Sequence, residues 1–177
     1  MSQKTKWAID PTHTEIGFKV KHMMFTNVSG KIVKYDATIE TDGDDFSNAV
    51  IEFSGDVDSI TTGSADRDAH LLSPDFFDAT QFPKLNFKAT SLVKADEGNF
   101  ELSGDLEIHG VTNPVKFEVE FGGLMKDPWG NIKAGFNING KINRKDYGLT
   151  WNAALETGGV LVGEDVKINA EVQLIKQ

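Results

Sequence analysis

The sequence predicts an all-β protein folded as a closed, eight-stranded antiparallel barrel. Apolar and polar residues alternate in eight separate runs, and a period of two places every second side chain on one face of a sheet. In the clearest run, Val115, Phe117, Val119 and Phe121 alternate with charged residues. Turn-forming residues separate the runs at hairpin intervals, which favours an up-and-down strand order.

Composition sets limits on the class of protein. A chain of 177 residues is expected to form one domain over residues 1–177. Its net charge of -9 disfavours nucleic acid and anionic membranes as partners. The chain has no cysteine, which excludes disulfides, thiolate zinc sites and cysteine nucleophiles. Without a signal-peptide pattern or a membrane-spanning apolar run, we expect no stable membrane insertion and a cytoplasmic location, or a periplasmic one if a leader is removed.

The first part of the chain is expected to form four strands. Asp10 and Pro11 end a short first strand, and the longer strand after it begins at Thr14. Residues 27–30 and residues 41–45 have turn-like compositions. The strands expected here are the short one at residues 7–9 and three of the eight alternating runs, at residues 14–22, 33–39 and 49–57.

A short helical excursion is expected over about residues 64–79, at one mouth of the barrel. Ser64 is a good N-cap, and Asp66 lies near the positive end of the helix, where a carboxylate is stabilising. The segment from Ser73 to Asp75 repeats the cap signal, with Pro74 at the first helical position. The excursion should therefore hold a helix of about two turns followed by a second short turn.

The remaining strands follow this excursion. Residues 95–99 form a hairpin turn, residues 109–114 turn the chain again, and residues 144–159 are irregular. Glycines in mid-strand on the apolar face, such as Gly104 and Gly140, permit the bends that closing a barrel needs. The strands expected here cover residues 85–93, 100–108, 115–121, 134–142 and 166–174.

The inward face is rich in phenylalanine set among small residues. On residue pattern alone, a packed core is the simpler interpretation, because the side chains of an eight-stranded barrel can just fill it. A cavity is the alternative, since alanines and glycines beside the aromatic rings leave volume unfilled. The residue pattern thus leaves open what occupies the interior.

Six segments carry a family resemblance. The most specific is Arg-Asp-Ala-His-Leu-Leu-Ser-Pro-Asp-Phe-Phe-Asp at residues 67–78. The others cover residues 7–14, 18–22, 82–87, 104–112 and 142–149. In order and spacing these segments resemble the YceI-like family, a lipocalin-like group that binds polyisoprenoid lipids. The resemblance extends along nearly the whole chain.

The resemblance implies a lipocalin-like barrel with a long apolar cavity for an isoprenoid quinone, a polyisoprenoid or a fatty-acid derivative. The expected role is binding, storage or transport, with the lipid as the bound ligand, no other cofactor and no catalytic residue. At the mouth, His22, Arg67, His70 and Trp151 are candidates for head-group contacts. The expected cavity wall consists of Phe18, Val20, Tyr35, Phe53, Phe87, Leu106, Phe117, Phe121, Phe136 and Ile138.

Two alternatives to lipid binding stay open. One is an enzyme acting on a lipid in the barrel, which would need a perturbed ionisable group inside the cavity. The other is a stress-associated structural barrel without a ligand. Family members often form dimers, and a homodimer here could use Val50, Ile60 and Trp129.

The polar candidates have structural interpretations. The four histidines are far apart in sequence and do not predict a metal site. Arg67 and Arg144 are expected to pair with carboxylates, Arg67 to fasten the helical excursion. Asp42 and its acidic neighbours are expected to form a solvated turn rather than a calcium loop.

Overall fold

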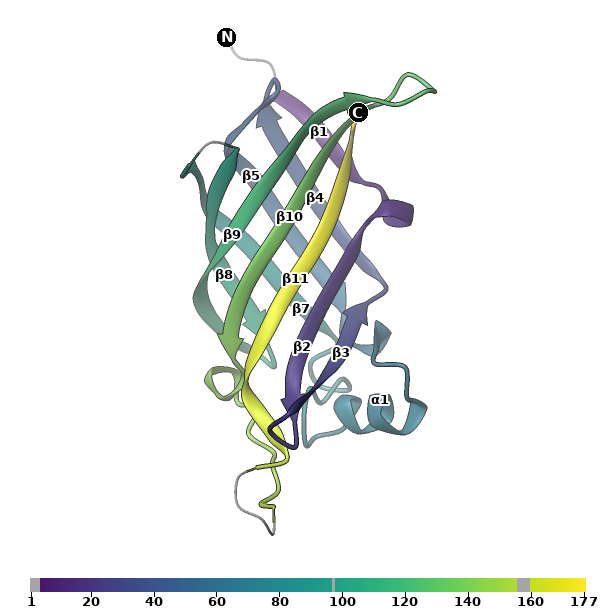
Figure 1. Cartoon of the computed structure of the whole chain (residues 1–177), viewed down its shortest axis with the longest axis vertical. Helices are drawn as coiled ribbons and strands as arrows, with labels where there is room; N and C mark the ends of the chain where they lie inside the picture. Colours follow the sequence, from purple (N-terminus) through teal and green to yellow (C-terminus); the bar gives the residue numbers. More distant parts are fainter. Residues whose placement is uncertain (1–3, 97, 156–159) are drawn as a thin grey trace.

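The structure is a computed structural model that describes residues 4–96, 98–155 and 160–177. Within these residues, antiparallel strands close into an eight-stranded barrel, as the sequence predicts (Figure 1). One short α-helix, α1, lies beside one end of the barrel. The strands are β1 (Lys4–Ile9), β2 (Glu15–His22), β3 (Thr26–Ile32), β4 (Tyr35–Asp42), β5 (Asp45–Asp56), β6 (Ile60–Thr61), β7 (Lys84–Lys94), β8 (Asn99–Ile108), β9 (Val111–Lys126), β10 (Ile132–Asn143) and β11 (Val162–Lys176).

Two of the eight wall strands are each broken into two segments. β1 pairs with β4 and β11, whereas β2 pairs with β3 and the same β11. The break between β1 and β2 is a 3-10 turn (Pro11–His13) whose N-cap is Asp10. The Asp10 carboxylate accepts hydrogen bonds from Thr12 and from Lys133 Nζ, the latter at 2.8 Å. These contacts, above all that with Lys133, hold the pKa of Asp10 well below its usual range.

The turn predicted at residues 27–30 is wrong. Those residues lie in β3, and the turn is formed instead by the segment from Met23 to Phe25. Gly30 lies in the strand with the Phe18 ring over it, so an added Cβ would clash with Phe18 Cζ. The real turn lacks the usual Gly or Asn signal, since Met23 and Met24 themselves adopt positive φ angles.

The predicted helix is confirmed as α1 (Ala65–Leu72), with Ser64 as its N-cap. The Asp68 carboxylate accepts hydrogen bonds from the Thr61 hydroxyl and from the backbone and hydroxyl of Thr62. Arg67 pairs with no carboxylate of the described residues, contrary to the expectation; it donates to the hydroxyl and carbonyl of Thr62. Asp68 and Arg67 therefore both fasten the helix, through hydrogen bonds to the Thr61–Thr62 segment.

The second short turn predicted after Ser73 is present as a series of hydrogen-bonded turns. The expected turn at residues 109–114 is shorter than predicted. Only His109 and Gly110 turn the chain, both at positive φ, and β9 begins immediately afterwards. Around Tyr147, the expected helical turn exists as a 3-10 turn (Arg144–Tyr147), and residues 156–159 of the predicted irregular segment lie outside the described residues.

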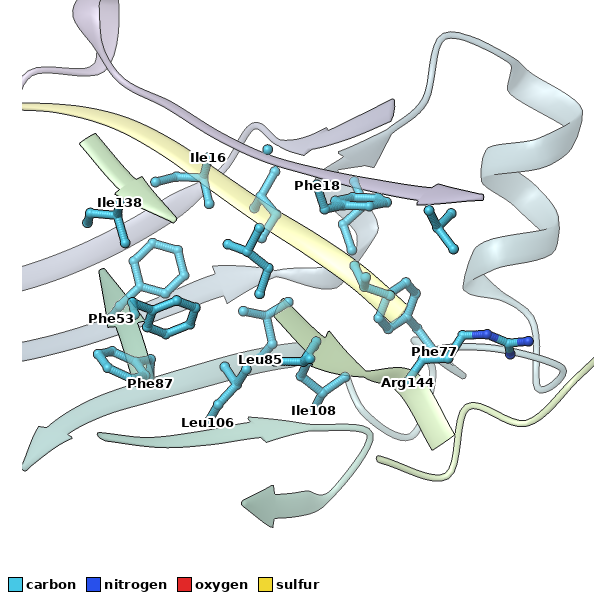
Figure 2. A pocket seen from close by; sticks show the side chains of 18 of the residues that line it. Ile16, Phe18, Phe53, Phe77, Leu85, Phe87, Leu106, Ile108, Ile138 and Arg144 are labelled. Carbon is cyan, nitrogen blue, oxygen red and sulfur yellow. The ribbon is translucent and has the colours of Figure 1, made fainter. Parts of the chain in front are cut away.

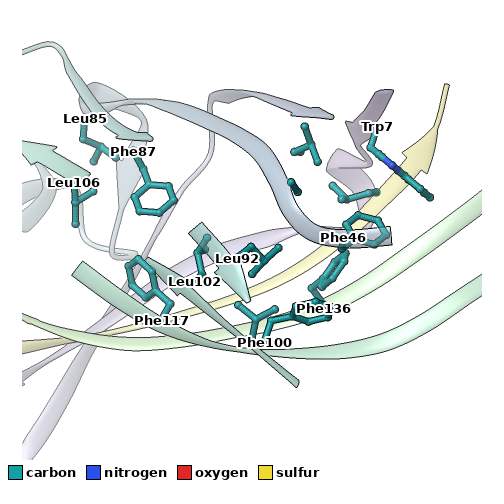
Figure 3. Close-up of a cluster of buried hydrophobic side chains, with 14 of the residues drawn as sticks. Trp7, Phe46, Leu85, Phe87, Leu92, Phe100, Leu102, Leu106, Phe117 and Phe136 are labelled. Atoms are coloured by element: carbon teal, nitrogen blue, oxygen red, sulfur yellow. The ribbon is translucent and has the colours of Figure 1, made fainter. Parts of the chain in front are cut away.

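Aromatic side chains fill the end of the barrel where β1 begins (Figure 3). The ring of Phe46 lies 5.0 Å from that of Trp7 and 4.9 Å from that of Phe136. Phe121 stacks on Phe136 at 5.0 Å and meets the edge of Phe100. We call these five residues the aromatic plug. Four of the rings are buried and that of Phe121 is partly buried, so aromatic side chains pack this end of the barrel.

Two of the three residues expected at a dimer interface lie on the surface. Ile60, proposed for a dimer interface, is buried in the core, because β6 pairs with β3 and turns this side chain inward. Val50 and Trp129 are exposed, as that proposal requires. Among the described residues, no helix has the length and apolar character needed to cross a membrane.

Candidate functional site

A cavity of about 600 Å³ occupies the barrel between the aromatic plug and α1 (Figure 2). This volume lies within the range of about 300–1,000 Å³ that ligand sites commonly have. Its wall consists almost entirely of aliphatic and aromatic side chains contributed by strands from all round the barrel. Phe46 belongs both to the aromatic plug and to the wall, so it forms part of the cavity floor.

Most of the predicted wall residues line this cavity. They share an inward position on their strands, and the sequence alternation identified that face correctly. They are Phe18, Val20, Phe53, Phe87, Leu106, Phe117, Phe136 and Ile138.

Two of the predicted wall residues, Tyr35 and Phe121, do not line the cavity. Phe121 lies in the aromatic plug, beyond the floor. Tyr35 is the first residue of β4, next to the break in this wall strand, and its ring stacks beside that of Phe53 at 5.7 Å. Burial, followed by the negative charge of Asp10, raises the pKa of the Tyr35 hydroxyl.

Sequence reasoning missed many aliphatic wall residues. The same alternation that identified the phenylalanines would have found them, but the prediction favoured aromatic residues. Figure 2 shows several of these side chains pointing into the cavity beside the phenylalanines. Examples are Ile16, Ile51, Leu85, Ile108, Ile168 and Leu174.

The four residues predicted at the mouth lie together there and line the cavity opening. His70 is central: its Nε2 contacts the Asp75 carboxylate at 2.9 Å, and its ring meets the edge of Trp151 at 4.9 Å. Arg67 lies on the same helix, and His22 ends β2. The mouth therefore combines aromatic surface with several hydrogen-bonding groups.

Arg144 is a cavity-lining residue whose role was predicted incorrectly. Its guanidinium is buried and pairs with no carboxylate among the described residues. It donates instead to the carbonyls of Leu149 at 2.6 Å, Trp151 at 2.9 Å and Gly163 at 2.7 Å. Burial lowers the pKa of this guanidinium. Arg144 thus positions the backbone that carries Trp151 at the mouth.

Ionisable groups in the described part of the wall gather at the mouth. Lys21 and His22 come from the end of β2, three more from α1, and Arg144 from the turn after β10. Across residues 4–96, 98–155 and 160–177, no group of three or more His, Cys, Asp or Glu could hold a metal ion. His13 instead contacts the Asp10 carboxylate, and His109 Nδ1 contacts the carbonyl of Tyr147. The deep part of the wall is uncharged.

Comparison with known proteins identifies the family. Residues 7–174 match the YceI-like domain. A UPF0312 protein of Staphylococcus aureus (strain N315) is 38% identical over 170 residues, which cover 96% of each chain. The solved YceI protein of Campylobacter jejuni has a TM-score of 0.74 at 32% identity, covering 95% of this chain and 96% of that one.

Two more distant structures share the fold. Burkholderia cenocepacia BcnA has a TM-score of 0.80 at 19% identity, covering 93% of this chain and 98% of that one. A polyisoprenoid binding domain from Saccharophagus degradans has a TM-score of 0.68 at 13% identity, covering 97% and 98% of the two chains. On the domain match and the identity to its relatives, the chain belongs to the YceI-like family.

Proposed function

We propose that the barrel binds a long-chain apolar lipid of the isoprenoid class, and stores or carries it without bond chemistry. The observation that supports this is the cavity of about 600 Å³, whose deep wall is apolar and whose polar groups gather at one mouth. Such a site suits an amphiphile, with its tail along the barrel axis and its head group near His70 and Arg67.

The energetics favour a long tail. Each methylene removed from water contributes about 0.8 kcal/mol, so several isoprene units supply affinity without any charged contact. The aromatic plug limits how deep a tail can reach, and Phe46 lies at that limit. The fold shared with a polyisoprenoid binding domain supports an isoprenoid in particular.

The two alternatives fit less well. A solid structural barrel is inconsistent with the cavity. An enzyme would need an ionisable group in the apolar interior, and the described ionisable wall residues lie at the mouth. We therefore propose a binding protein in which the lipid is the ligand and no further cofactor takes part.

A matched pair of variants on β4 tests the proposal. Ala37 lines the cavity, whereas the next residue, Thr38, is exposed on the outer face. Ala37→Phe should fill part of the cavity and weaken binding of a dansyl-labelled farnesyl probe by at least about tenfold, a loss of 1.4 kcal/mol. Thr38→Phe should bind the probe as the unaltered protein does.

Native mass spectrometry of gently purified protein gives an independent readout. A co-purifying isoprenoid, released by organic extraction, is the expected result. The proposal fails if no lipid co-purifies and the probe produces neither a fluorescence change nor a thermal shift. Equal probe binding by the two β4 variants, with both folded, would also contradict a site inside the barrel.

A further inference from the structure

The turn between β2 and β3 exposes three consecutive apolar side chains. Met23, Met24 and Phe25 are 42%, 60% and 73% exposed, and we call them the mouth tip. Met23 and Met24 have φ angles of 53° and 69°, a region that disfavours bulky residues. Gly or Asn would form this turn with less strain. The turn therefore presents apolar side chains to solvent at a cost in backbone conformation.

The mouth tip is continuous with the opening of the cavity. It directly follows His22, which lines the mouth, and the Met23 N–H donates to the carbonyl of Leu161 at 2.8 Å. Leu161 also lines the cavity, and its neighbour Val160 is exposed. In Figure 1 the β2–β3 turn lies at the α1 end of the barrel, and the β9–β10 turn lies at the opposite end. A body that covered the mouth tip would therefore cover the cavity opening.

The charge of this hairpin differs from that of the whole chain. The chain carries a net charge of -9, but β2 and β3 hold three lysines, Lys19, Lys21 and Lys31, against one carboxylate, that of Glu15. All three lysines are exposed. None of them forms an ion pair with any residue that the structure describes. Lys21 lies two residues before Met23 and pairs with Asn27, so it places a cation next to the mouth tip, whereas Lys19 and Lys31 lie farther back along the strands. Apolar side chains with an adjacent cation match the acyl-chain and phosphate layers of a bilayer interface.

We propose that the mouth tip docks transiently on a zwitterionic phospholipid bilayer, with the cavity opening facing the lipid. The role of this contact, exchange of an isoprenoid between bilayer and barrel, rests on the proposed function. Three apolar side chains are too few for stable anchoring, so contact is brief. The overall negative charge repels anionic membranes, which selects a zwitterionic surface.

A fluorescent label tests docking on ligand-free protein. Because the chain has no cysteine, Phe25→Cys provides a single attachment point for an environment-sensitive nitrobenzoxadiazole dye. Trp129→Cys, on the exposed β9–β10 turn at the opposite end, is the matched control. Phosphatidylcholine vesicles should shift the emission of the label at position 25 to the blue and leave that at position 129 unchanged. No shift at position 25, or equal shifts at both, would overturn the proposal.

The transfer rate of a dansyl-farnesyl probe tests whether docking serves exchange. The rate should rise with the concentration of phosphatidylcholine vesicles for the unaltered protein and for Met125→Ser/Trp129→Ser. Met24→Ser/Phe25→Ser should slow transfer at least about tenfold and leave equilibrium probe affinity unchanged. Transfer at the unaltered rate in this variant would overturn the proposal. If the unaltered protein does not bind the probe, the proposed function fails, and the label response alone decides whether docking occurs.

Discussion

Three inward phenylalanine rings lie directly over glycines of a neighbouring strand, and this arrangement predicts which glycines cannot be changed. The rings of Phe18, Phe87 and Phe117 occupy the space where a side chain would stand at Gly30, Gly104 and Gly140 respectively. The substitution Gly104→Ala is the most informative, because the added methyl group would meet backbone as well as a ring.

The structure gives the size of the effect. At position 104 a Cβ would lie 2.5 Å from the Lys88 carbonyl oxygen and 2.5 Å from Phe87 Cζ. Ordinary carbon contacts are about 3.5–4.0 Å, so β7 and β8 must separate by about 1 Å. Overpacking of this kind costs about 1–3 kcal/mol. For a domain of this size, each kcal/mol lowers Tm by about 2–4 °C, so we expect a loss of about 6 °C.

Gly135→Ala is the control, since no heavy atom would lie within 4 Å of its Cβ. Its stability should stay within about 0.5 kcal/mol of the parent or rise slightly, because alanine restricts the unfolded chain. Urea titration and thermal melts of both variants make the comparison. Equal stability of the Gly104 and Gly135 variants would refute the argument that ring-over-glycine packing builds this wall.

Three other substitutions have defined outcomes. Asp10→Asn should cost about 1.5–3 kcal/mol at pH 7 by removing the ionic contact with Lys133. Because the pKa of Asp10 is lowered in the folded protein, its carboxylate contributes to folding stability at pH 7, and this contribution is lost as the pH falls below the usual carboxyl range. Urea unfolding at pH 7 and pH 3 should therefore show a smaller change in stability with pH for Asp10→Asn than for the unaltered protein. Arg144→Lys should lower the free energy of unfolding by about 3 kcal/mol, since an ammonium cannot reach all the carbonyls that the guanidinium spans. A protease should also cut the segment that follows residue 148 faster in this variant than in the unaltered protein. Trp7→Phe should cost about 1–2 kcal/mol in urea unfolding by removing the buried 2.8 Å bond to Thr41, and an unchanged midpoint would contradict this.

Much of the fold could be predicted because its rules are local. Alternation depends on neighbouring residues, and a cap such as Ser64 is recognised from the few residues after it. The β2–β3 turn escaped prediction because Met23 and Met24 adopt a conformation that their residue types disfavour. In the sequence Gly30 indicates a turn, but this position requires glycine because the Phe18 ring of the adjacent strand occupies the space of a side chain.

The site was predicted less completely, because alternation reports which face a residue occupies and not its depth along the barrel. Phe121 and Phe136 both point inward, yet only Phe136 lines the cavity. The role of Arg144 depends on carbonyls as far along the chain as Gly163, which no spacing rule connects. Such contacts follow from how the chain closes on itself.

That closure has a consequence for how the protein is made. Trp7, Ala8 and Ile9 pair with residues of β11, so the first and last strands of the barrel must find each other. Pairing across such sequence distances is slow, because loop closure must precede the contacts that stabilise it. Until β11 is in place, the hairpins already synthesised expose their apolar inner faces, a state prone to aggregation. The cavity inside the barrel therefore comes into existence only when synthesis of the whole wall is complete.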